Sequence, residues 1–224
     1  MASWQPGFCS TNAGQNKDEC ETQTADRPDA TQFSIHGMWP DDLDNKDIFP
    51  CYCNLGTPIA CDQNSADDST ISLSPAVRAK LDIAMPGTQS DLHLHEWTKH
   101  GTCYEDFLSS ADAGADPDEY YGDTMALLGQ LNASAVRDLF VAHLGQDLTA
   151  AEIEAAFDTA FGAGAGQRVV VRCDRNSGVI TEMWIGLKGE ISAASDLGAL
   201  ILAAPPTTTS TNATSCSGPV VKVN

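Results

Sequence analysis

Apolar residues recur at helical spacing through the middle of the chain. The clearest pattern follows Thr149 and Glu152, which match a capping box at the start of a helix. Beyond them one apolar stripe comprises Ile153, Ala156, Phe157, Ala160 and Phe161. The same reasoning predicts three earlier helices, over residues 75–84 after Ser74, from Asp116 with a stripe from Tyr121 to Leu131, and from Ser134 to Gly145. We expect all of these stripes to pack in the core.

Shorter patterns on either side of this region predict strands. Residues 32–39 alternate up to Pro40 and place Phe33 and Ile35 on one face, Ser34 and His36 on the other. Residues 168–173 and 179–187 flank a turn sequence, Asn176-Ser177-Gly178. These two runs predict a hairpin.

The composition is that of a globular protein. The chain has 224 residues, of which 42% are hydrophobic and 19% charged, so disorder is excluded as its main state. This length fits one domain or two small ones, and we expect a single domain over residues 1–224. Apolar runs stay shorter than the ~18 residues that a membrane-spanning helix needs, so no membrane partner is expected.

The net charge changes the picture of possible partners. Lys and Arg number 12 against 31 Asp and Glu, which gives −19 at pH 7. A protein that holds duplex DNA needs cations opposite the phosphates, and one that binds anionic membranes needs a basic surface. Neither DNA nor a membrane is therefore expected as a partner.

The eight cysteines point to an oxidising compartment. The nearest approach to a paired metal knuckle is Cys51-Tyr52-Cys53, whose spacing is too short for zinc, so four disulfides are the better interpretation. The start, Met1 to Trp4, leads directly into polar sequence without a secretory signal. We therefore expect a mature extracytoplasmic form with an added first Met.

Residues 93–103 carry the most informative chemistry. On a helix at about 100° per residue, the polar groups of His95, Glu96, Lys99 and His100 share one arc. Leu94, Trp97 and Tyr104 form the opposite, apolar side. Burying ionisable groups of both signs on one arc costs free energy, so an arrangement that serves packing alone is not expected. The alternative to a functional site is a face of the helix that is exposed to solvent. His93 is expected at the surface.

A metal site fits this segment poorly. Two His four residues apart on a helix reach one zinc ion, but His95 and His100 are five apart and Lys99 holds the intervening place. His93 and His95 lack a clear third ligand. We therefore predict no metal and no cofactor.

A Lys beside two His and a Glu instead suits the stabilisation of an anion that gains charge, as at a phosphodiester under in-line attack. Such a reaction needs a base for the incoming hydroxyl and an acid for the leaving oxygen. His36 is the candidate for the second imidazole. It precedes Gly37, which lets a ligand approach the backbone, and Trp39, which offers a stacking face for a base.

Two segments of the chain resemble the two active-site segments of the ribonuclease T2 family. They are residues 33–40 (Phe-Ser-Ile-His-Gly-Met-Trp-Pro) and residues 95–103 (His-Glu-Trp-Thr-Lys-His-Gly-Thr-Cys). Met38 stands where that family most often has Leu. The resemblance implies an α+β fold, an antiparallel central sheet with packed helices, stapled by disulfides. It also implies an extracytoplasmic (secreted, periplasmic or vacuolar) endoribonuclease, here expected as a monomer, with little base specificity and no metal.

By motif position, the resemblance makes His100 the general base and His36 the general acid. Glu96 and Lys99 would stabilise the phosphorane, His95 would hold the phosphate, and Trp39 and Asp41 would seat a base. The products would be a 2′,3′-cyclic phosphate and then a 3′-phosphate. Two alternatives stay open: a metal-dependent hydrolase that uses His93, His95 and Glu96, and a catalytically silent secreted RNA-binding protein.

All eight cysteines are expected in disulfides. Cys9 would pair with Cys20 to close the N-terminal loop, and Cys173 with Cys216 to hold the C-terminal tail. Cys103 would bond to one of Cys51, Cys53 or Cys61. The resemblance favours Cys53, which leaves Cys51 with Cys61.

Overall fold

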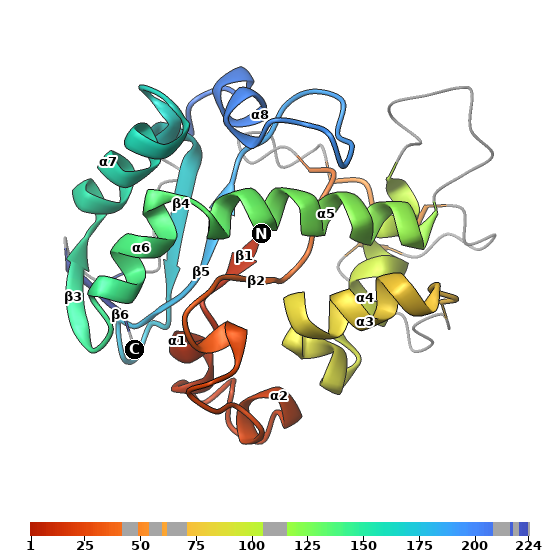
Figure 1. Ribbon diagram of the computed structural model, residues 1–224, viewed down its shortest axis with the longest axis horizontal. Helices are drawn as coiled ribbons and strands as arrows, with labels where there is room; N and C mark the ends of the chain where they lie inside the picture. The colour runs from red at the N-terminus through yellow and green to blue at the C-terminus, as the bar shows by residue number, and fades with distance from the viewer. Residues whose placement is uncertain are drawn as a thin grey trace.

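The computed structural model describes residues 1–41, 49–53, 60–61, 71–104, 116–207, 216 and 220–223. In this part of the chain, helices surround a small antiparallel sheet, the α+β arrangement that was expected (Figure 1). The helices are α1 (Gln5–Cys9), α2 (Asp18–Glu21), α3 (Pro75–Ala84), α4 (Leu92–Lys99), α5 (Pro117–Asn132), α6 (Ala135–Ala142), α7 (Ala150–Phe161) and α8 (Leu197–Ala203). The strands are β1 (Ala2–Ser3), β2 (Ser34–Ile35), β3 (Gln146–Thr149), β4 (Val169–Cys173), β5 (Ile180–Ile185) and β6 (Val220–Val223).

The central sheet has the strand order β2-β1-β5-β4, and its neighbouring strands are antiparallel. The expected hairpin is present as β4 and β5, with Gly178 at a positive φ of 72° in the turn. The short strand β1 lies between β2 and β5, with Ala2 opposite both Ile35 and Met183. Residues near position 35 and position 183 therefore meet on one sheet.

Local capping explains where the main helices begin. The Ser74 hydroxyl accepts a hydrogen bond from the Val77 N–H at the start of α3, and Asp116 caps α5 in the same way. Thr149 and Glu152 form the complete capping box at α7. The predicted starts of these helices are confirmed.

Several predicted elements are shorter than expected, two of them in this framework. The strand over residues 32–39 pairs only at Ser34–Ile35, and Ser34 is as buried as Phe33, so both faces of β2 lie inside the protein. The helix after Ser134 ends at Ala142 instead of Gly145. His143 leaves the helical conformation there, and Gly145 turns the chain at a φ of 72° into β3, which pairs with β6.

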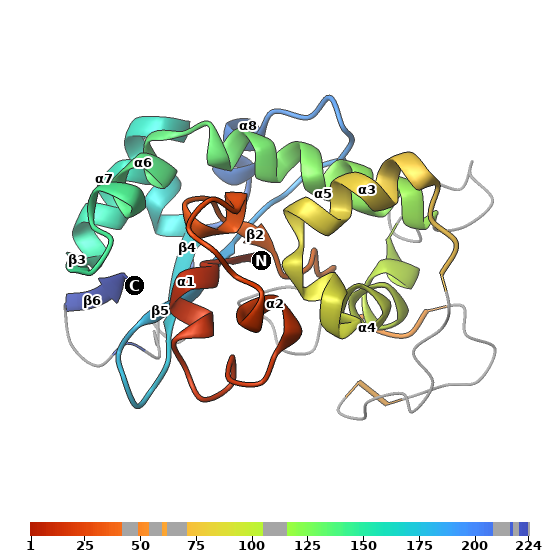
Figure 2. The same cartoon turned by 60° about the horizontal axis from the view of Figure 1, so that its bottom comes forward.

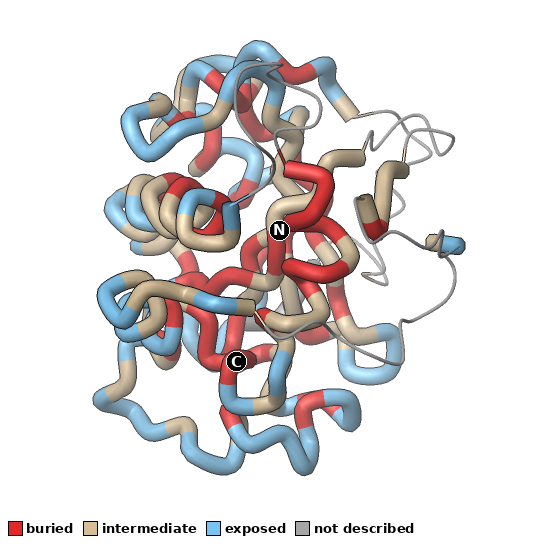
Figure 3. The backbone as a smooth tube through the Cα atoms, turned by 90° about the vertical axis from the view of Figure 1, so that its right-hand side faces the viewer, coloured by how far each residue is buried: buried red, intermediate tan, exposed pale blue. Residues whose placement is uncertain are grey.

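An aromatic cluster joins the sheet to the helices. The rings of Trp4, Phe33 and Phe140 meet edge to face, with centroids 4.9–5.1 Å apart. All three side chains are buried, and they connect the end of β1, the start of β2 and α6. Figure 3 shows buried segments gathered through the centre of the molecule and exposed ones along its outer loops.

The helices divide between the two ends of the molecule. Figures 1 and 2 show α3 and α4 at one end, α6 and α7 at the other, and α5 spanning the distance between them. Helix α5 packs against both α3 and β2. Helix α4 also contacts α5, through the Trp97 and Tyr120 rings, so the chain just after β2 and helix α4 both lie beside α5.

Disulfides link the loops around this framework. The pairs are Cys9–Cys20 and Cys173–Cys216, as expected, together with Cys53–Cys103 and Cys51–Cys61, which the resemblance favoured. The Cys53–Cys103 bridge ties a distant loop to the residues just after α4. Within the described residues, no helix is both long and apolar enough to cross a membrane.

Candidate active site

Helix α4 presents one side to the site and packs its other side on α5. The buried Trp97 ring meets the Tyr120 ring edge to face at 5.8 Å between centroids. The Tyr121 hydroxyl donates a hydrogen bond to the carbonyl oxygen of His93. The helix ends at Lys99, and His100 is its C-terminal cap residue. The expected helix, which included His100, is therefore shorter.

The expected arc of polar residues on α4 is uneven in burial. Glu96 and His100 are each 1% exposed, whereas His95 and Lys99 are half-buried. His93, expected at the surface, is instead buried, with its Nε2 3.0 Å from the Arg78 guanidinium of α3. The reason is that Arg78 of α3 and Tyr121 of α5 both contact His93, and contacts between distant residues cannot be derived from the spacing along one helix.

His36 follows β2 and lies between two carboxylates. Its Nδ1 is 2.7 Å from Oε2 of Glu182 on β5, and its Nε2 is 3.5 Å from Oε1 of Glu96 on α4. The sheet supplies one partner and the helix the other. His36 itself keeps 29% of its side chain exposed.

Trp39 connects the two candidate histidines. Its Nε1 donates a 2.7 Å hydrogen bond to Glu96 Oε2, and its ring is stacked on the His100 ring at 4.4 Å and 15°. The His36 ring meets it edge to face at 5.9 Å. His100 therefore covers one face of the Trp39 ring. The expected contact of Trp39 with a nucleotide base stays a prediction, and it would use the part of the ring that His100 does not cover.

Gly37 allows this close arrangement. A Cβ atom at this position would overlap Glu96 Oε2 and would press on Trp39 Nε1. A glycine is therefore required here by the approach of Glu96 to the backbone, which places its carboxylate between His36 and Trp39.

The two histidines have opposite electrostatic surroundings. Burial by itself would lower the pKa of His36, but the hydrogen bond to Glu182 and the negative charges of Glu96 and Glu182 outweigh it and raise that pKa. Burial lowers the pKa of His100 to about 3, with help from the positive charges of Lys99, His95 and His36. The site therefore favours the charged form of His36 and the neutral form of His100.

The remaining predicted residues lie around this centre. Burial raises the pKa of Glu96, against the opposing effects of His36 and Trp39. The Lys99 ammonium is 6.0 Å from the centroid of the Tyr52 ring, and the Lys99 carbonyl accepts a hydrogen bond from the Tyr52 N–H. Asp41 is half-buried shortly after Trp39.

Three residues at the site were not identified from the sequence. They are Glu182, Trp184 and Phe49; Phe49 lies edge to face with both Trp39 and His100. The available signal was a carboxylate and an indole two residues apart on β5, which share one face of an otherwise apolar strand. Their distance from His36 along the chain concealed the connection.

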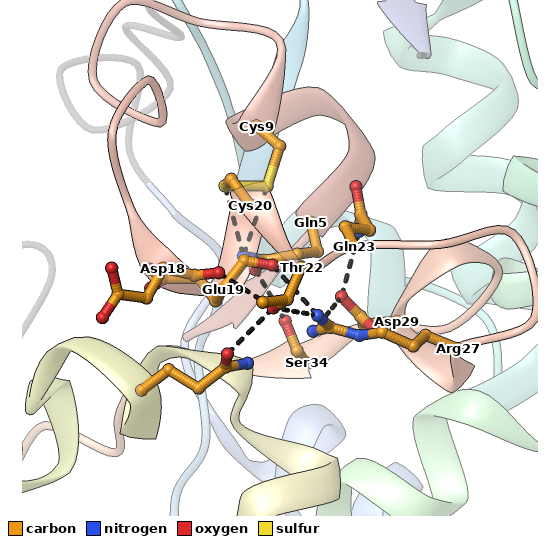
Figure 4. Close-up of polar contacts among 11 residues, drawn as sticks. Gln5, Cys9, Asp18, Glu19, Cys20, Thr22, Gln23, Arg27, Asp29 and Ser34 are labelled. Carbon is orange, nitrogen blue, oxygen red and sulfur yellow. Dashed lines mark hydrogen bonds and ion pairs between the residues drawn. A yellow bond between two sulfur atoms is a disulfide. The ribbon is translucent and has the colours of Figure 1, made fainter.

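Polar contacts of the N-terminal loop join it to the chain before His36 and to the chain before α4 (Figure 4). The Ser34 hydroxyl of β2 donates to Gln5 Oε1, just before His36 in the chain. Gln89 and Ser90 lie shortly before α4. The Thr22 hydroxyl donates to Gln89, and the Ser90 hydroxyl donates to the buried carboxylate of Glu19. The N-terminal loop thereby contacts the chain that leads into both β2 and α4.

The candidate metal ligands do not assemble in the described part of the chain. No group of three or more His, Cys, Asp or Glu side chains there is placed to hold a metal ion. His93, one of the ligands considered, faces Arg78.

Comparisons with known proteins agree with the geometry. A model of the ribonuclease T2 family matches residues 1–198. Ribonuclease I of Escherichia coli (strain K12) is 28% identical over 207 residues, which cover 84% of this chain and 73% of that protein. Ribonuclease Rh of Rhizopus niveus is 27% identical over 191 residues, 80% of this chain and 66% of that protein.

Two solved structures share the fold at 15% sequence identity. Actibind, a T2 ribonuclease, matches with a TM-score of 0.53 over 86% of this chain and 79% of its own. Japanese pear S3-RNase matches with a TM-score of 0.52 over 81% of this chain and 80% of its own.

Proposed function

Because this chain belongs to the ribonuclease T2 family and is a T2-type endoribonuclease, we propose that it cleaves single-stranded RNA without a metal, through a 2′,3′-cyclic phosphate. The observation that carries the proposal is the opposite tuning of His36 and His100 on either side of Trp39. Two groups of one type whose pKa values are pushed apart are the pair that acid–base catalysis requires.

In the first step His100 is the base. It takes the proton of the 2′-hydroxyl as that oxygen bonds to phosphorus, and His36 gives its Nε2 proton to the 5′-oxygen as the P–O5′ bond breaks. In the second step the roles reverse: His36 takes a proton from water, whose oxygen attacks phosphorus, and His100 protonates O2′ as the ring opens. The product is a 3′-phosphate.

The other residues stabilise and seat the substrate. Lys99, His95 and Glu96 lie on or next to the same side of α4, where we place the phosphoryl oxygens that gain charge. Trp39 and Asp41 would contact the base, and stacking on an indole discriminates little among bases, which supports low base specificity. The four disulfides support an extracytoplasmic compartment.

The test is an RNA cleavage assay in the presence of a chelator, with products identified. We expect a cyclic phosphate to accumulate before the 3′-phosphate, and single-stranded DNA to stay intact because it has no 2′-hydroxyl. Replacing His36 or His100 by Ala should each lower the rate at least ~10²-fold, as for loss of a positioned acid or base.

His143→Ala is the matched control, since that imidazole bonds to the Leu139 carbonyl at the end of α6. Fragments with 5′-phosphates, cleavage of DNA, or complete loss of activity with chelator would overturn the proposal. RNA binding by the wild-type chain without cleavage would instead favour the silent binding protein.

A further inference from the structure

The shortest contact of the His36 ring is with a residue outside both active-site segments. Glu182 Oε2 lies 2.7 Å from His36 Nδ1, closer than the 3.5 Å that separates Glu96 Oε1 from Nε2. Because Nδ1 faces Glu182, the hydrogen bond sets which ring nitrogen keeps its proton. The transferable proton is then on Nε2.

Glu182 is held firmly in this position. Its second oxygen, Oε1, accepts a 2.8 Å hydrogen bond from Trp184 Nε1, so both carboxylate oxygens have a partner. The Arg172 guanidinium lies over the Trp184 ring at 4.5 Å from its centroid. Strand β5 is an inner strand of the sheet, where Glu182 is opposite Ser3 on β1 and Arg172 on β4.

We propose that Glu182 is a positioning residue for the general acid: its carboxylate fixes the orientation of His36 and stabilises its protonated form. This inference rests on the proposed function, in which His36 protonates the leaving 5′-oxygen. During that step the Nε2 proton moves to O5′ as the P–O5′ bond breaks, while the Nδ1 proton stays shared with Glu182. The arrangement follows the same logic as a carboxylate that orients a catalytic imidazole.

Glu96 is a weaker candidate for this role. Its Oε1 is 3.5 Å from Nε2, the nitrogen that carries the transferable proton, whereas Glu182 Oε2 is 2.7 Å from Nδ1. Burial raises the pKa of Glu96, whereas the bond and charge of His36 lower the pKa of Glu182 in spite of its partial burial. Four charged or titratable groups face His36 in the described residues. They are Glu182 on β5, Glu96 on α4, His100 at the end of α4, and the amino group of Met1 beside β1. Of these, Glu182 is the group bonded to Nδ1.

The sharpest test changes the leaving group. We compare Glu182→Gln with wild type on uridylyl-3′,5′-adenosine, whose 5′-oxygen must be protonated, and on uridine 3′-(4-nitrophenyl phosphate), whose nitrophenolate leaves unprotonated. Glu182→Gln should lower kcat at least ~10-fold on the first substrate and less than ~3-fold on the second, because general acid catalysis contributes only to the first. A merely structural defect would lower both alike.

The second readout is the pH profile. The basic limb of kcat/KM on the dinucleotide should move to lower pH by about one unit in Glu182→Gln, since the charge that favours the imidazolium is removed. Glu182→Asp keeps the charge, so its limb should stay nearer that of wild type. Glu190→Gln, an equal change of charge at an exposed site, should change neither the limb nor the rate.

His36→Ala distinguishes a failure of the proposed function from a failure of the role of Glu182 alone. If it loses activity equally on both substrates, His36 is not the acid and the proposed function fails. If the loss of kcat in His36→Ala depends on the leaving group but the loss in Glu182→Gln does not, only the role of Glu182 is overturned.

Circular dichroism and thermal unfolding monitor folding of the variants. Should Glu182→Gln not fold, Trp184→Phe removes the donor that holds Glu182 Oε1 while it keeps the carboxylate charge. This variant should lower kcat on the dinucleotide more than on the nitrophenyl ester, and equal losses on the two substrates would also overturn the inference.

Discussion

His36 and His100 carry the same imidazole group in opposite surroundings. His36 bonds to one carboxylate and lies near a second, whereas His100 is buried against Trp39 with cations nearby. The two carboxyl groups differ in the same way, because the pKa of Glu96 is raised and that of Glu182 is lowered. At the scale of single residues, position determines chemistry more than residue type does.

These shifts predict the pH dependence of kcat/KM. The proposed base, His100, would act when neutral, so the acidic limb would follow its pKa, lowered to about 3, and the rate should persist far into acid. The proposed acid, His36, would act when protonated, so the rate should fall only above the ordinary pKa of histidine, about 6.5, because the pKa of His36 is raised.

A short substrate at constant ionic strength provides the measurement. The optimum should lie on the acid side of neutrality. A rate that still rises past pH ~9 would show that a group other than histidine is the base.

Helix α4 depends on its neighbours for its position. It is short, and Asp91 at its N-cap has a left-handed backbone at a φ of 61° without a side-chain cap. Such a helix is marginal alone, so packing must hold it. Helix α5 supplies that support through Tyr120 and Tyr121.

Removing one of these contacts should affect both stability and activity. Tyr121→Phe leaves the His93 carbonyl without the hydroxyl donor and should cost about 1–3 kcal/mol in the free energy of unfolding, with a severalfold lower kcat. Thr149→Ala breaks the capping box of α7, away from the site, and should cost about 1 kcal/mol with kcat unchanged. Urea unfolding and steady-state kinetics measure both. Equal effects of the two variants on kcat would contradict a specific role for the α4–α5 contact.

The whole molecule carries a charge of −19 and acts on a polyanion. Long-range repulsion opposes the approach of RNA, and only local cations such as Lys99 act against it. A negative exterior also favours the release of cleaved fragments.

The charge predicts an unusual salt dependence. From about 10 mM to about 150 mM salt the Debye length falls from roughly 30 Å to roughly 8 Å, so repulsion weakens. We expect kcat/KM for long RNA to rise over this range, while kcat/KM for a dinucleotide changes little. A steady fall in kcat/KM for long RNA with added salt would mean that binding is governed by counterion release from many phosphate contacts.

The sequence by itself determined the features that depend on neighbours along the chain. The caps at Ser74, Asp116 and Thr149 set helix starts because they bond within one turn. The hairpin of β4 and β5 followed from the turn between them. The motif segments gave the family, since residue order alone carries that likeness.

The tertiary structure decided what depends on contacts between distant residues. Strand β1 and helix α8 were not expected, and the pairing of β1 needs β2 and β5 on either side. Glu182 meets His36 across 146 positions of sequence. The protonation states of His36 and His100 could not be predicted from the sequence either. The shift of each pKa depends on burial and on charges that only folding brings close to the imidazole.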